Sequence, residues 1–204
     1  MARRGRRHAF ERLSPATTAL VVVDMVPFFV LENPYCAGVV PQINALAHAL
    51  RQAGGVVAWV LPSSDDPFAA VSKEFFGPQV AETYRTSGGF GPLPARLAAG
   101  LGHEPDDVFV EKSAASAFFP GRCTLPDILA GRGVRTVIVT GTVTNVCCEA
   151  TVRDARTLGY RVIMVADANA TVRDEMHNAS LTAVYRSFGD VRPTADVLAL
   201  IAAG

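Results

Sequence analysis

Cys147 stands where a predicted strand gives way to a predicted helix, and a cysteine in that position can act as a nucleophile. The apolar run 134–139 predicts the strand, and residues 148–158 predict the helix. Backbone N–H groups in the first turn of a helix lack intrahelical partners, and together with the helix dipole they favour thiolate over thiol. The same N–H groups can hold the oxyanion that forms when sulfur attacks a carbonyl. The junction therefore indicates a cysteine hydrolase.

An acid and a cation close two other predicted strands. Asp24 ends the apolar run 20–23, and Lys112 follows the run 107–111. Because ligands of an open parallel sheet bind outside the carboxyl ends of its strands, we expect both side chains near Cys147. A carboxylate that takes the thiol proton and an ammonium that favours the thiolate are what nucleophilic catalysis requires.

Each of these three residues also has an ordinary structural explanation. An Asp that closes a strand is often a helix N-cap or turn residue, and a Lys at a strand end is often a solvated charge. A buried cysteine is more often a core residue than a nucleophile. On spacing alone, the joint position of the three at strand ends supports the catalytic and the structural interpretation about equally.

Short β-branched runs alternate with amphipathic stretches along the chain, and this alternation predicts the fold. Strands are expected at 20–24, 56–61, 107–111, 136–140, 161–165 and 190–192, and helices at 39–52, 125–130, 148–158 and 175–188. Strands separated by single helices imply right-handed crossovers and hence a parallel sheet between two helix layers. The prediction is a three-layer α/β/α Rossmann-like domain with a mainly parallel sheet of about six strands. Residues 62–105 look irregular, which favours a wall or lid over a site.

Length and charge limit the classes of function. The 204 residues suit one domain, and 19 Lys+Arg balance 19 Asp+Glu, so neither nucleic acid nor an anionic membrane is an expected partner. No apolar run approaches the ~20 residues that span a bilayer, which favours a soluble, cytoplasmic protein. We expect residues 1–14 to form a basic arm ahead of a domain at 15–204. A solvated or partner-contacting arm is favoured over a twin-arginine signal, because no longer apolar region follows the arginines.

The remaining cysteines show no metal-binding or redox spacing. Cys36, Cys123, Cys147 and Cys148 form neither a C-x-x-C pair nor a zinc-type pattern, so four thiols are expected. Cys148 would point about 100° away from Cys147 around a helix, which favours a small core residue. Cys36 and Cys123 are expected in loops, with structural roles.

Three motifs resemble those of the isochorismatase-like cysteine hydrolases, a family that includes nicotinamidase and N-carbamoylsarcosine amidohydrolase. They are Val21-Val22-Val23-Asp24-Met25 with Phe29, Glu111-Lys112-Ser113 with Ser116-Ala117-Phe118, and Gly141-Thr142-Val143-Thr144-Asn145-Val146-Cys147 with Glu149-Ala150-Thr151. By this resemblance Asp24 is the base, Lys112 the cation beside the site and Cys147 the nucleophile. The oxyanion hole would be the N–H groups of Val143 and Cys147, with a cis peptide between Thr142 and Val143.

Departures from the family pattern bear on metal and substrate. Nicotinamidases carry an Asp/His metal cluster after the second strand, but residues 62–66 contain no histidine, so we expect neither a metal nor another cofactor. Isochorismatases proper lack the cysteine and cleave a vinyl ether. Val26 replaces a frequent glutamine, which should alter the pocket floor.

Substrate contacts are expected from Phe29, Phe118 and Thr144, and Phe119 could extend the apolar wall. Aromatic residues beside strands are nevertheless more often core residues. His177 lies near the start of the last predicted long helix, where a structural hydrogen bond is favoured over acid–base chemistry.

The predicted activity is hydrolysis of a small amide, ureido or cyclic amide substrate through an acyl-thioenzyme. A catalytically silent binding or assembly protein that keeps the fold is one alternative. A metal-independent nicotinamidase-like enzyme is another, and a larger amide-bearing metabolite would fit if residues 87–92 open. The resemblance also implies a homo-oligomer, either a dimer or a tetramer.

Overall fold

A single six-stranded sheet forms the centre of the molecule in the computed structural model, which describes residues 5–204 and, for Glu32, the backbone alone. The strands are β1 (Thr18–Val23), β2 (Val56–Pro62), β3 (Val108–Lys112), β4 (Thr136–Thr142), β5 (Arg161–Ala170) and β6 (Asp190–Arg192). Their order is β3-β2-β1-β4-β5-β6, and every neighbouring pair is parallel. The predicted α/β class is confirmed.

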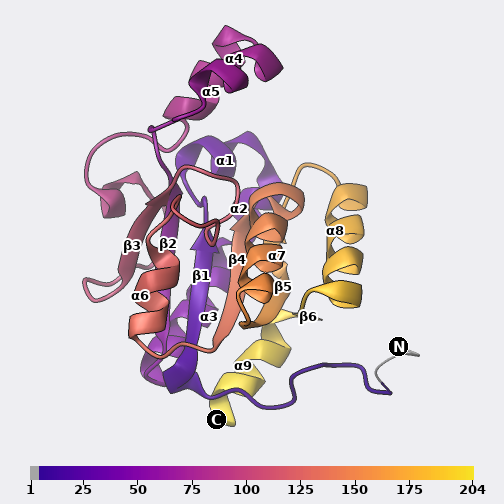
Figure 1. Ribbon diagram of the computed structural model, residues 1–204. Coiled ribbons are helices and arrows are strands. Elements are labelled where there is room, and N and C mark those ends of the chain that lie inside the picture. The colour runs from indigo at the N-terminus through magenta and orange to yellow at the C-terminus, as the bar shows by residue number, and fades with distance from the viewer. Residues whose placement is uncertain (1–4) are drawn as a thin grey trace.

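Helices cover both faces of the sheet (Figure 1). They are α1 (Pro27–Glu32), α2 (Pro34–Gly38), α3 (Val40–Gln52), α4 (Ala69–Phe76), α5 (Pro78–Thr86), α6 (Leu125–Gly131), α7 (Glu149–Thr157), α8 (Asp174–Ser187) and α9 (Thr194–Ala202). One apolar core lies between the sheet and α3 with α9, and the other lies between the sheet and α6, α7 and α8. The molecule therefore has the three layers that the alternating pattern predicts.

Alternate residues of β1 point into the two cores. All six residues of this strand are buried, with Leu20 and Val22 in one core and Val21 in the other. A strand that is covered on both faces reads as a continuous apolar run, and this is why β1 was recognisable in the sequence.

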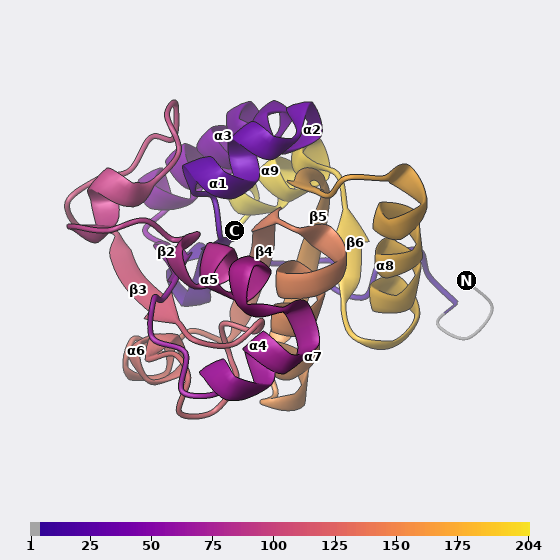
Figure 2. The same cartoon turned by 90° about the horizontal axis from the view of Figure 1, so that it is seen from above.

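The prediction that residues 62–105 are irregular is wrong in part, because the segment contains α4 and α5. Gly77 joins the two helices with φ at 81°, a left-handed conformation that glycine adopts without strain, and Pro78 begins α5. The Gly-Pro pair therefore marks a junction between two short helices. Both helices project beyond the carboxyl end of the sheet (Figure 1) and lie across that end when seen from above (Figure 2).

A buried arginine fixes this projecting segment to the sheet. Arg96 donates from Nε to the Gly88 carbonyl at 2.6 Å and from Nη2 to the Pro62 carbonyl at 2.6 Å. Its Nη1 lies 2.8 Å from Glu111 Oε1. One side chain thus connects the segment after α5 with the carboxyl ends of β2 and β3.

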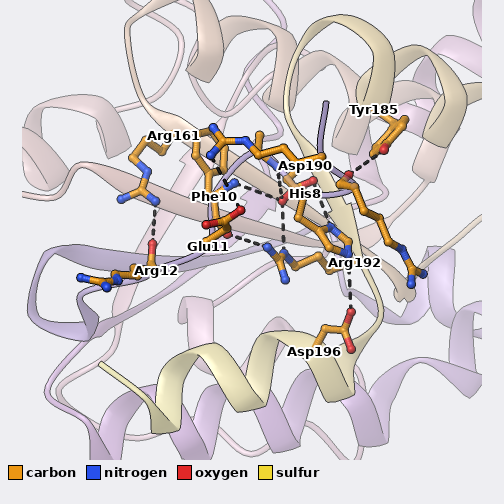
Figure 3. A network of polar contacts seen from close by, with 12 residues as sticks. His8, Phe10, Glu11, Arg12, Arg161, Tyr185, Asp190, Arg192 and Asp196 are labelled. Atoms are coloured by element: carbon orange, nitrogen blue, oxygen red, sulfur yellow. Dashed lines mark hydrogen bonds and ion pairs between the residues drawn. The ribbon is translucent and has the colours of Figure 1, made fainter. Parts of the chain in front are cut away.

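The N-terminal segment binds to the same domain, at β6 and its neighbours (Figure 3). Asp190 is fully buried and accepts hydrogen bonds from the backbone N–H groups of Ala9 and Phe10, while His8 Nδ1 lies 3.3 Å away. Arg192 donates to Asp190 and to the Phe10 carbonyl. The predicted basic arm thus contacts its own domain from residue 7 onward, whereas the arginines at positions 3 and 4 lie outside the described residues.

Within residues 5–204, no helix combines the length and the apolar character that crossing a bilayer requires.

Candidate active site

The carboxyl ends of β1 and β4 form the point where strand order reverses, because the chain proceeds from β1 to β2 and β3 on one side and from β4 to β5 and β6 on the other. Open α/β sheets bind ligands at such points. Gly141 of β4 lies opposite Val23 with φ at 117°, and a Cβ there would stand 2.1 Å from the Val23 carbonyl oxygen. Only glycine lets the two strands come this close. Thr142 Oγ1 then donates to the Asp24 carbonyl at 2.8 Å.

A buried ion pair spans this edge of the sheet. Lys112 Nζ lies 2.7 Å from Asp24 Oδ2, and the two side chains are only 4% and 1% exposed. Lys112 reaches Asp24 from the end of β3, across the intervening β2, and it also donates to the Ala114 carbonyl at 3.1 Å. Asp24 itself has φ at 52°, a left-handed conformation that is uncommon for a residue with a side chain.

Cys147 completes the group, since its thiol lies close enough to Asp24 and Lys112 for both charges to shift its pKa. The structure therefore brings together the three residues that stood at separate strand ends in the sequence. Burial raises the pKa of Cys147 to about 12, and the Asp24 charge adds to the rise while Lys112 opposes it. Burial also raises the pKa of Asp24, against the effect of Lys112. For Lys112, burial acts to lower the pKa, but Asp24 and Cys147 outweigh it and the pKa lies above its ordinary value.

These shifts oppose the effect that a helix start has on a cysteine. Cys147 lies within a π-helical turn, Thr144–Cys148, and the α-helical hydrogen-bonding pattern begins only at Glu149. Burial and the nearby carboxylate outweigh any effect of a helix start, so Cys147 rests as a thiol. Moving the proton from Cys147 to Asp24 leaves the net charge of the buried group unchanged. The site can therefore produce a thiolate without burying an additional charge.

The loop before Cys147 has the backbone form that the resemblance implied, with a cis peptide between Thr142 and Val143. Val143 accepts from the N–H groups of Val146 and Cys148 through its carbonyl. Among residues 5–204 no group accepts a hydrogen bond from the Val143 N–H. This amide is free to hold an oxyanion.

Thr144, an expected substrate contact, is fully buried and its hydroxyl lies 2.9 Å from His177 Nδ1. That hydroxyl is occupied by a protein partner, so the expectation for Thr144 is not supported. His177 forms the kind of structural hydrogen bond that was favoured for it. Ser180, one turn further along α8, donates to the Thr144 carbonyl at 3.3 Å. The sequence pattern did not single out Ser180 as a residue near the site, although its spacing of three from His177 places both on one helix face.

The expected aromatic contacts need correction as well. Phe118 has no exposed surface and packs edge-on against Tyr160 with ring centroids 5.2 Å apart, so it belongs to the core beneath α6 and α7. Phe29 packs edge-on against Phe28 and the core under α3. Phe28, in contrast, lines a cavity of about 360 Å³ together with Phe90 and hydroxyl-bearing residues at the end of α5, namely Thr83, Thr86 and Ser87.

The other cysteines have structural positions. Cys148 is fully buried with Sγ 4.0 Å from the Thr140 carbonyl oxygen, as predicted for a core residue. Cys36 is buried within α2, where a loop was expected. Cys123 pairs with Lys112 through an isolated antiparallel bridge.

The residues after β2 do not fit a metal. Asp66 Oδ1 accepts from the Phe68 N–H and so serves as a turn cap. Across the part of the chain that the structure describes, no three His, Cys, Asp or Glu side chains converge in a way that could hold a metal ion.

The chain is similar to several known proteins. Residues 18–196 match the family model described as "Isochorismatase domain". The chain is 32% identical to an uncharacterized isochorismatase family protein, YwoC, of Bacillus subtilis (strain 168), over 89% of this chain and 92% of that protein. It is 31% identical to the ureidoacrylate amidohydrolase RutB of Enterobacter sp. (strain 638), over 90% of this chain and 88% of that protein. A cysteine hydrolase from Pseudomonas syringae pv. phaseolicola 1448A superimposes with a TM-score of 0.83 at 30% identity, over 97% and 98% of the two chains.

Proposed function

The chain belongs to the isochorismatase family, and on that premise we propose that it is a cysteine-dependent hydrolase of a small amide or ureido compound. The observation that carries the proposal is the buried Asp24–Lys112 pair at 2.7 Å with the Cys147 thiol beside both charges. The ureido class is supported by the 31% identity to a ureidoacrylate amidohydrolase.

In the first half-reaction the thiol proton moves from Cys147 to Asp24 as sulfur attacks the substrate carbonyl carbon. The carbonyl π electrons move onto oxygen, and the N–H groups of Val143 and Cys147 hold the resulting oxyanion. The tetrahedral intermediate collapses, the C–N bond breaks, and Asp24 gives its proton to the departing nitrogen. An amine leaves, and an acyl group stays on sulfur. For a ureido substrate that group is a carbamoyl.

In the second half-reaction water attacks the thioester while Asp24 accepts a proton from the water. Collapse of this intermediate breaks the C–S bond and releases an acid, or a carbamate from a ureido substrate. The proton on Asp24 returns to Cys147 and restores the resting site. Lys112 stays charged throughout and offsets the negative charge that alternates between Asp24, the sulfur and the oxyanion.

The proposal is tested with a panel of primary amides, ureido compounds and cyclic amides, assayed for release of amine or ammonia. On the substrate with the highest kcat/KM, Cys147→Ala should lower kcat/KM by roughly 10³-fold or more, because the nucleophile is lost. Cys148→Ala is the matched control, since this adjacent cysteine is fully buried in the core. Full turnover by Cys147→Ala, or loss of turnover only in Cys148→Ala, would sink the proposal.

A further inference from the structure

The nucleophile loop 143–148 is held by α8 through side chains that the reaction itself does not use. His177 Nδ1 lies 2.9 Å from Thr144 Oγ1, and Ser180 donates to the Thr144 carbonyl at 3.3 Å. Ser180 also contacts Glu149 Oε2, at the start of α7. His177 and Ser180, on one face of α8, therefore contact Thr144. Thr144 lies between the two proposed oxyanion donors, Val143 and Cys147.

The contact between His177 and Thr144 uses the ring nitrogen Nδ1. In a neutral ring with its proton on Nε2, Nδ1 accepts from the Thr144 hydroxyl. Burial lowers the pKa of His177, while Ala166 and Asp174 oppose the shift, so the ring is neutral at pH 7.

The same loop has another anchor, since Thr171 Oγ1 donates to Asn145 Oδ1 at 2.7 Å. Thr171 lies between β5 and α8, so the segment before α8 also holds the loop. Both members of the Thr144 contact are protein groups, and Thr144 is fully buried. Because the Thr144 hydroxyl does not face solvent, the network acts on the geometry of the loop.

Resting on the function proposed above, we propose that His177 and Ser180 are positioning residues that hold loop 143–148 against α8. They keep the Cys147 sulfur and the Val143 N–H in place around the reacting carbonyl. Misplacing such groups by about 1 Å costs roughly 100-fold in rate. The effect falls on kcat, because both side chains act through the hydroxyl and the carbonyl of Thr144 within the loop.

The test compares His177→Phe, which keeps a ring but removes the acceptor, with His177→Asn, whose amide oxygen restores an acceptor near Nδ1. His177→Phe should lower kcat roughly 10- to 100-fold with KM within about twofold of wild type. His177→Asn should recover most of the loss. Asn178→Ala is the matched control, because it is the next residue on α8 and is exposed. A kcat within twofold of wild type for His177→Phe, or an equal loss in His177→Asn, would overturn the proposal.

Amide hydrogen exchange separates this proposal from the proposed function, because it needs no substrate. In His177→Phe, peptides covering 143–148 should exchange about tenfold faster than in wild type, whereas Asn178→Ala should match wild type. Unchanged exchange in His177→Phe would overturn the positioning role whatever the activity. If Cys147→Ala retained turnover, Cys147 would not be the nucleophile. Faster exchange in His177→Phe would then still support the positioning role of His177.

Discussion

Asp24 and Lys112 form a buried ion pair beside the half-buried thiol of Cys147. Burial raises the pKa of Asp24, and the nearby charge of Lys112 opposes that rise. In the mechanism proposed above, the thiol stays protonated until a carbonyl arrives. Catalysis would then depend on proton transfer from Cys147 to Asp24, and a resting thiolate would not be needed.

The pH dependence of kcat/KM tests the protonation states that the mechanism assigns to Asp24 and Cys147. The ionised form of Asp24 is the active base, and its pKa is raised, so kcat/KM should fall as pH drops through a value above the ordinary ~3.9 of an aspartate. A thiol with the ordinary pKa of ~8.5 would make kcat/KM rise as pH increases through that value. Burial instead raises the pKa of Cys147 to about 12. The profile of kcat/KM should therefore show no rise centred near pH 8.5. A steep rise centred near pH 8.5 would contradict this assignment of protons.

Among the elements, the segment after β2 is attached to the sheet through the buried side chain of Arg96, in addition to contacts such as Tyr84 with Phe28. Arg96 satisfies the carbonyls of Gly88 and Pro62 and pairs with Glu111, while only 8% of the residue is exposed. The α4–α5 pair that lies across the site therefore connects to the sheet through a buried polar contact as well as through the chain.

Arg96→Met should destabilise the protein by about 2–4 kcal/mol, because two buried carbonyls lose their donor. It should also raise KM on the best amide, because the covering segment is no longer fixed. Urea denaturation and steady-state kinetics measure both effects. Arg85→Met is the matched control within the same segment, since Arg85 pairs with Glu82 at the exposed surface and should leave the unfolding midpoint unchanged. Equal midpoints for wild type and Arg96→Met would show that the contact is dispensable.

Elements differ in how far their sequences predict them. The strands are buried runs of β-branched residues, and Asp24 and Lys112 end such runs, so local pattern was enough to predict them and their shared edge. The roles of Thr144 and Phe118 depend on which neighbour each side chain meets, His177 and Tyr160 respectively, and such contacts come from distant segments. Helices α4 and α5 are short and lack a strong apolar stripe of buried residues. The glycine and proline turn signals around them therefore led to the prediction of an irregular segment.

Across the whole molecule, the N-terminal segment closes the domain at the far edge of the sheet from β3. Asp190 has no exposed surface and meets Arg192 and the backbone of residues 9 and 10 (Figure 3). Tyr185 of α8 donates to the Arg7 carbonyl, and Arg161 of β5 donates to the Arg12 carbonyl. Segments separated by about the full length of the chain thus form one polar cluster.

Asp190→Asn should lower the free energy of unfolding by about 3 kcal/mol, since it leaves the buried Arg192 without its carboxylate. The folded protein should keep its kcat, because this cluster lies at β6 and not at the switch point between β1 and β4. Thermal denaturation and the amide assay measure the two quantities. Glu11→Gln, which breaks only the exposed pair with Arg6, serves as control and should match wild type in both. A loss of kcat with unchanged stability would contradict this division of roles.

The role of Cys147 as the nucleophile is tested by the mass of the enzyme quenched in acid during turnover of its best amide. The account predicts an adduct with the mass of the acyl or carbamoyl group on peptide 136–153, assigned to Cys147 by fragmentation and absent from Cys147→Ala. Cys148→Ala should still carry it. Turnover by Cys147→Ala at the wild-type rate, or an adduct on any other residue, would contradict the account.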